Sequence, residues 1–175
     1  MFNNKKKRGL RTSHIAVCGL MTALAMIFSY VESLIPIPIP VYGIKLGIAN
    51  IAIIAVLYSI GWREAVIVNV LRIILASFMF GNFNSFLFSI AGGVLSIAVM
   101  IILKHTNVFS RVAVSVAGGV AHNIGQIIAA VFIMGSAAII YYLPVLILSG
   151  VITGVVIGIV SGIVIDCIKR GGQTP

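Results

Sequence analysis

The stretch Gly118-Gly119-Val120-Ala121-His122-Asn123-Ile124-Gly125-Gln126 decides the fold, because it puts polar side chains in the middle of an apolar run, Val112 to Met134. As a helix, this run can cross about 30 Å of hydrocarbon at about 1.5 Å per residue. His122 and Gln126 are four residues apart and share one helix face, whereas Asn123 is rotated by about 100°. Polar groups near the bilayer midplane normally face a cavity or a partner. The stretch therefore predicts one wall of a polar pocket.

A second apolar run offers the opposite wall. Asn69 and Arg72 are three residues apart, on one face of the helix predicted from Ala65 to Phe80. An arginine at a helix centre costs about 2.5–3.5 kcal/mol on insertion scales, so something must compensate it. We expect the two helices to form a polar pocket between them.

The sequence leaves two explanations for the charge on Arg72. Only three carboxylates exist, Glu32, Glu64 and Asp166, and all three are predicted near membrane boundaries rather than at the depth of Arg72. An anionic ligand, held by the two-pronged guanidinium group, is the first explanation. The second is structural, with Arg72 bonded to carbonyls and amides of the helix that carries His122.

Composition places the chain in a bilayer. Its 175 residues are 61% hydrophobic and 9% charged, with a mean hydropathy of +1.21, whereas soluble domains carry about 25% charged residues. We predict an all-α polytopic membrane protein with six transmembrane helices. The second has Asn50 about one turn inside it and ends at about Ile60, and the other five are at 13–34, 65–80, 85–103, 112–134 and 143–168. The domain organisation is then a basic N-terminal segment (1–12), one membrane domain (13–170) and a short tail (171–175).

The distribution of cations predicts the topology. With six helices, ten cations fall on the side of both termini, and Lys45 alone falls on the other side. The positive-inside rule then makes both termini cytoplasmic, in the cell membrane of a bacterium. The ten are Lys5, Lys6, Lys7, Arg8, Arg11, Arg63, Lys104, Arg111, Lys169 and Arg170.

Further candidate residues fall at helix ends. Lys45, Asn50, Asn82 and Asn84 are predicted at the outer ends of three helices, where they either line the mouth of the pocket or serve as solvated loop and cap residues. Together with the two walls, the candidate substrate-binding set is Lys45, Asn50, Asn69, Arg72, Asn82, Asn84, His122, Asn123 and Gln126.

Small residues predict close helix contacts. Gly19 and Ala23 form a pair four residues apart in the first helix, suited either to packing inside the bundle or to docking a partner. Gly150, Gly154, Gly158 and Gly162 repeat every four residues and predict backbone-to-backbone packing of the last helix.

The sequence lacks the residue sets of several function classes. It has no paired carboxylates at helical spacing, no Asp-rich motif for Mg²⁺-diphosphate chemistry and no Walker A loop, so we predict a protein that is not an enzyme by itself and has no cofactor. His14 and His105 fall at the cytoplasmic side, far from His122, which argues against a metal site. The cations are not interleaved with aromatic residues, so a nucleic-acid partner is not expected.

Three motifs resemble a known family. Lys45-Leu-Gly-Ile-Ala-Asn50, Asn69-Val-Leu-Arg72 and Gly119-Val-Ala-His-Asn-Ile-Gly-Gln126 look like the small membrane family named Gx transporter or heptaprenyl diphosphate synthase component I, over about residues 13–168. That family is similar to the substrate-binding S components of energy-coupling-factor (ECF) transporters. The resemblance implies an S-component-like bundle, with Gly19 and Ala23 docking onto a transmembrane coupling protein that works with two ATPases.

Three functional hypotheses follow. The first is a substrate-capture S component of an importer for a small anionic or amphipathic metabolite. The second is a non-catalytic membrane subunit that assists a polyprenyl (heptaprenyl) diphosphate synthase, holding the prenyl chain in the apolar bundle. The third is a structural subunit whose polar residues only lock the helices together.

Overall fold

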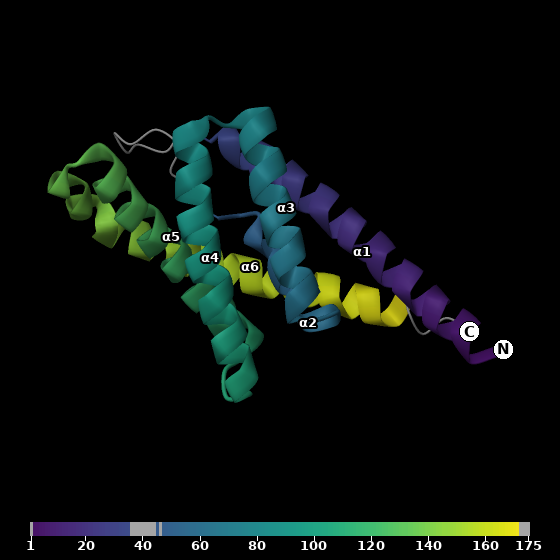
Figure 1. The fold of residues 1–175 in the computed structure, drawn as a ribbon. Helices are drawn as coiled ribbons and strands as arrows, with labels where there is room; N and C mark the ends of the chain where they lie inside the picture. The colour runs from purple at the N-terminus through teal and green to yellow at the C-terminus, as the bar shows by residue number, and fades with distance from the viewer. Residues whose placement is uncertain (1, 36–44, 46, 172–175) are drawn as a thin grey trace.

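The chain folds as a helical bundle. The computed structural model describes residues 2–35, 45 and 47–171, and the side chains of 14–35, 45 and 47–167. Within these residues the elements are α1 (Phe2–Ser33), α2 (Asn50–Ser59), α3 (Trp62–Phe80), α4 (Phe83–Thr106), α5 (Arg111–Met134), the 3₁₀ helix η1 (Ala137–Tyr142) and α6 (Leu143–Gly171) (Figure 1). The all-α fold and the order of the six predicted helices are confirmed.

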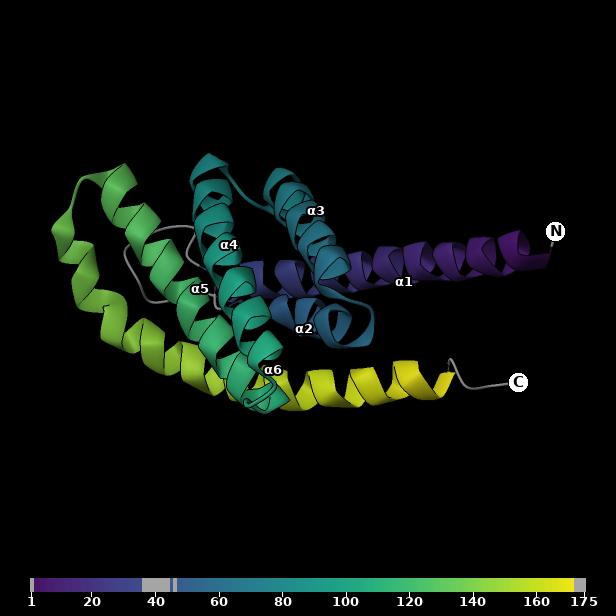
Figure 2. The ribbon, with the colours of Figure 1, turned by 60° about the horizontal axis from the view of Figure 1, so that its bottom comes forward.

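The helix bounds differ from the prediction at the two ends of the chain. α1 begins at Phe2, so it runs on through the predicted basic segment, and α6 continues to Gly171. The rest of the predicted tail, 172–175, lies outside the described residues. Figures 1 and 2 show the beginning of α1 and the end of α6 extending to the same end of the molecule.

Within the described residues, four segments are long and apolar enough to cross a membrane, namely 14–33, 83–106, 111–134 and 137–167. The protein is therefore a helical membrane protein, but the predicted count of six spans is not confirmed. α2 has 10 residues and reaches about 15 Å, half the thickness of the hydrocarbon. α3 has 19 residues but carries Arg63, Glu64 and Arg72, which lower its hydropathy.

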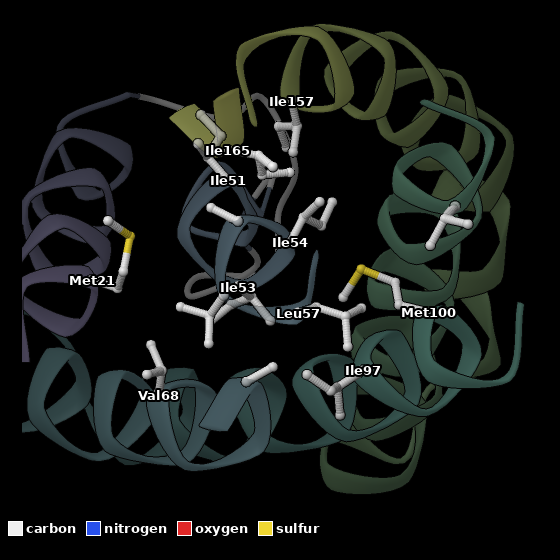
Figure 3. Packing of buried hydrophobic residues seen from close by; sticks show 14 residues of the cluster. Met21, Ile51, Ile53, Ile54, Leu57, Val68, Ile97, Met100, Ile157 and Ile165 are labelled. Carbon is white, nitrogen blue, oxygen red and sulfur yellow. The ribbon is translucent and has the colours of Figure 1, made fainter. Parts of the chain in front are cut away.

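α2 lies at the centre of the bundle. Residues 50–57 are all buried, and α1, α3 and α6 each pack against this helix. In Figure 3, Ile51, Ile53, Ile54 and Leu57 point in different directions toward the surrounding helices. A helix that is apolar all round must be covered on every side, which explains why so short a segment becomes the core.

The predicted glycine repeat of α6 brings α6 against α5. A Cβ atom at Gly154 would lie 2.6 Å from the Cα atom of Val116, and one at Gly158 would lie 2.7 Å from that of Val112. Gly150 meets Gly119 in the same way, with 3.1 Å to its carbonyl oxygen. The prediction of backbone-to-backbone packing is confirmed for these three glycines. At Gly162 no described atom lies within 4 Å of the added Cβ.

Candidate functional site

Seven buried polar side chains gather around the N-terminal end of α2. They come from α1, the segment before α2, α2 itself, α3 and α5, and none is more than 8% exposed. This set, called the central polar cluster below, comprises Glu32, Lys45, Asn50, Asn69, Arg72, His122 and Gln126.

The first part of the cluster joins the end of α1 to the start of α2. The Glu32 carboxylate accepts a hydrogen bond from the backbone N–H of Gly47 and, at 3.3 Å, from that of Ile48. Gly47 has a positive φ of 84°, which glycine adopts without steric cost. A Cβ at this position would lie 3.2 Å from both the Asn50 amide nitrogen and the His122 ring. The turn therefore needs glycine for its conformation and for the close approach of α5.

The second part lies between α3 and α4. The Asn69 amide donates to the backbone carbonyl of Gly93 at 3.2 Å and accepts from an Nη atom of Arg72 at 3.1 Å. The predicted pairing of Asn69 with Arg72 on one helix face is confirmed. Contact between α3 and α4 is close here, because a Cβ at Gly93 would lie 3.3 Å from Asn69.

The third part belongs to α5. The amide nitrogen of Gln126 lies 3.1 Å from Nε2 of His122, and its oxygen accepts from the backbone N–H of Lys45 at 3.2 Å. His122 and Gln126 thus lie on one face of α5, as predicted. Gly92 of α4 makes room for them, because a Cβ there would lie 2.9 Å from both side chains.

Asn123 faces the other way. Its amide donates to the backbone carbonyl of Leu146 on α6 at 2.6 Å, in agreement with its predicted rotation away from His122. This bond fixes α5 to α6, so Asn123 is placed as a packing residue rather than beside the cluster.

Charge in the cluster differs from the sequence expectation. Glu32 and Arg72 are each 2% exposed. The Glu32 carboxylate lies close enough to Arg72 and Lys45 to interact electrostatically with both. The expectation that no carboxylate reaches the depth of Arg72 is therefore wrong. Glu32 was missed because it ends a predicted helix, where a charged residue normally lies at the membrane surface. The cluster thus brings two basic side chains, Lys45 and Arg72, together with one carboxylate.

Several polar atoms of the cluster have no hydrogen-bond partner among the described residues. They are Nε of Arg72, Oε2 of Glu32, Nδ2 of Asn50 and Nδ1 of His122. An unpartnered buried polar group costs about 1–3 kcal/mol, so the cluster retains donors and an acceptor that a ligand can use. Among the described residues, no three His, Cys, Asp or Glu side chains are grouped to hold a metal ion.

The four residues predicted at the pocket mouth lie in two separate places. Lys45 and Asn50 belong to the central polar cluster, and Asn50 begins α2 instead of lying one turn inside it. Asn82 is exposed and caps α4, its side-chain oxygen accepting from the backbone N–H of Ser85 at 2.8 Å. Asn84 is exposed in the first turn of α4.

The predicted docking pair lies on an open face of α1. Gly19 and Ala23 are exposed, and no described atom lies within 4 Å of a Cβ placed at Gly19. Packing within the described part of the bundle therefore does not use Gly19, and docking by this pair stays a prediction.

Fold and site together define a helical membrane protein with a buried polar cluster that holds two basic side chains and one carboxylate. A family model described as "Heptaprenyl diphosphate synthase component I" matches residues 21–164. The chain belongs to this family, which confirms the resemblance drawn from its motifs. Neither the curated proteins nor the solved structures contain a match to this chain.

Proposed function

We propose that the protein is a non-catalytic membrane subunit that binds an amphipathic anion of the isoprenoid diphosphate class for a polyprenyl diphosphate synthase. The observation that carries this proposal is the central polar cluster, in which Arg72 and Lys45 are buried in an apolar bundle with only one carboxylate beside them. Family membership supports the nature of the partner, because the family is described as a component of such a synthase.

The charge of the cluster favours an anionic ligand. Arg72 uses an Nη atom for Asn69, while its Nε atom has no partner among the described residues. A guanidinium group binds carboxylate or phosphate through parallel N–H bonds, and hydrogen bonds to charged groups contribute about 1.5–3 kcal/mol each. A diphosphate would satisfy both cations, and its hydrocarbon chain would suit the surrounding apolar helices.

Catalysis is assigned to the partner. Prenyl transfer to a diphosphate needs Mg²⁺ held by carboxylates, and the whole sequence has three acidic residues. Glu32 already accepts bonds from two backbone N–H groups, and Asp166 pairs with Arg111 at 3.5 Å. The chain is therefore suited to holding a substrate or product rather than to transforming it.

A second candidate function is an ECF-type S component for uptake of the same class of ligand. The exposed small residues Gly19 and Ala23 favour it, because such a face lets another helix approach closely. In this alternative the partners are a transmembrane coupling protein and two ATPases, and the cluster is a transport site.

The test is purification of the tagged protein in a mild detergent from its own membranes, followed by mass spectrometry of bound proteins and small molecules. The proposal expects a prenyl synthase subunit and a co-purified isoprenoid diphosphate. Recovery of a coupling protein with two ATPases, and no synthase, would contradict the synthase proposal and establish the uptake alternative. A Gly19→Leu variant serves as a control, because it should lose the coupling protein but keep a synthase bound elsewhere.

A further inference from the structure

A cavity of about 350 Å³ lies where α3 ends and α4 begins. It is open on one side, since two of the three aromatic residues that line it, Phe78 and Phe83, are largely exposed. A buried serine and the turn between the helices complete the lining. The lining residues are Ser77, Phe78, Gly81, Asn82, Phe83 and Phe86. This cavity is separate from the central polar cluster, and nothing described so far uses it.

The walls of the cavity are fixed by local structure. The rings of Phe83 and Phe86 are 6.5 Å apart. Gly81 closes the turn against α3, because a Cβ at this position would lie 3.0 Å from the carbonyl oxygen of Ser77. Asn82 is held by its capping bond to α4. Ser77 is 7% exposed, and its hydroxyl has no partner among the described residues.

The cavity lies outward from the cluster along the same two helices. On α4, Phe86 precedes Gly93, the partner of Asn69, by seven residues, which is about 10 Å along a helix. On α3, Ser77 follows Arg72 by five residues, or about 7.5 Å. A ligand whose charged group is at Arg72 therefore needs a tail of about this length to reach the aromatic rings.

We infer that this aromatic cavity receives the hydrocarbon chain of the ligand whose anionic group is bound at the central polar cluster. The inference rests on the proposed function and specifies its ligand as a prenyl diphosphate longer than one isoprene unit. Charge at Arg72 and aromatic rings about two helical turns away match the two ends of such a molecule. Apolar burial in the cavity adds affinity for every carbon that reaches it.

The experiment compares three diphosphates, isopentenyl, geranyl and farnesyl, for binding to the purified full-length protein. The variants are Phe86→Ala, which removes a wall, and Ser77→Leu, which fills the cavity. Phe132→Ala is the matched control, because Phe132 is an exposed aromatic residue on α5 that does not line the cavity. Thermal unfolding of each variant shows that it is folded, and if one cavity variant does not fold, the other decides.

In the wild type, affinity should rise at least about tenfold from isopentenyl to geranyl diphosphate, since burial of each further carbon is favourable. This rise should fall below about threefold in both cavity variants and stay unchanged in Phe132→Ala, with isopentenyl diphosphate bound equally by all. An equal rise in affinity in every variant would overturn the inference and place the ligand's hydrocarbon chain in the bilayer or elsewhere in the bundle. Failure of the proposed function looks different, because then no diphosphate binds, or binding does not depend on Arg72.

Discussion

Replacement of Gly154 by alanine tests the packing that holds α5, and with it His122 and Gln126, in place. The added Cβ would lie 2.6 Å from the Cα atom of Val116, with two further backbone atoms at 3.1 and 3.2 Å. Because ordinary contacts begin at 3.4 Å, the two helices must separate locally by about 0.8 Å, the difference between 3.4 and 2.6. Backbone atoms cannot rotate out of the way as a side chain can.

Overpacking of this kind costs about 1–3 kcal/mol. At about 2–4 °C per kcal/mol for a chain of this size, the apparent melting temperature should fall by about 2–12 °C. The assay is thermal unfolding of the purified protein in detergent, read as loss of the monodisperse peak in size-exclusion chromatography.

Gly162→Ala is the matched control on the same helix. No described atom lies within 4 Å of its added Cβ, and alanine is favoured over glycine in a helix by up to about 1 kcal/mol. This variant should melt at the wild-type temperature or slightly above it. If Gly154→Ala is as stable as Gly162→Ala, the close α5–α6 contact is not present in the protein.

Three further substitutions separate packing from binding. Asn123→Ala should lower stability by about 1–3 kcal/mol, because it breaks the bond to α6, yet leave diphosphate affinity within about twofold; a large loss of affinity would put Asn123 back in the binding set. Lys104→Met should lower the stability of the protein by a similar amount, because the Lys104 ammonium donates to a carbonyl in the last turn of α2. Arg63→Met, at an exposed position on α3, should leave stability unchanged. Equal melting curves for the two variants would show that the ammonium does not hold α2. Glu32→Gln removes the one negative charge from the cluster and should tighten diphosphate binding about tenfold or more; weaker binding would mean that Glu32 organises the site instead of opposing the ligand.

Helix positions were predictable where apolar runs are long. The helix that carries His122 was expected at 112–134, from its apolar run, and is observed at Arg111–Met134. The shared face of His122 and Gln126 and the pairing of Asn69 with Arg72 followed from helical periodicity alone, since partners three or four residues apart are always neighbours.

The composition of the central polar cluster depended on long-range packing, which residue spacing does not encode. Glu32 and Lys45 were expected at membrane boundaries, but both are buried in the cluster. The reason is that α2 is short and its first residue is already inside the bundle. For the same reason, Glu32 was missing from the predicted surroundings of Arg72. Residue spacing also did not separate the buried pair Lys45 and Asn50 from Asn82, which is exposed at the α3–α4 turn.

The most direct test of the central claim is binding of farnesyl diphosphate to the wild type, Arg72→Gln and Arg63→Gln, measured on purified, folded protein. Both arginines lie on α3, but Arg72 is buried in the cluster and Arg63 is exposed at the start of the helix. Loss of hydrogen bonds between charged groups, worth about 1.5–3 kcal/mol, predicts about a 10- to 150-fold weaker affinity for Arg72→Gln. Arg63→Gln should bind like the wild type. Equal affinity in all three proteins would contradict the assignment of the central polar cluster as an anion-binding site.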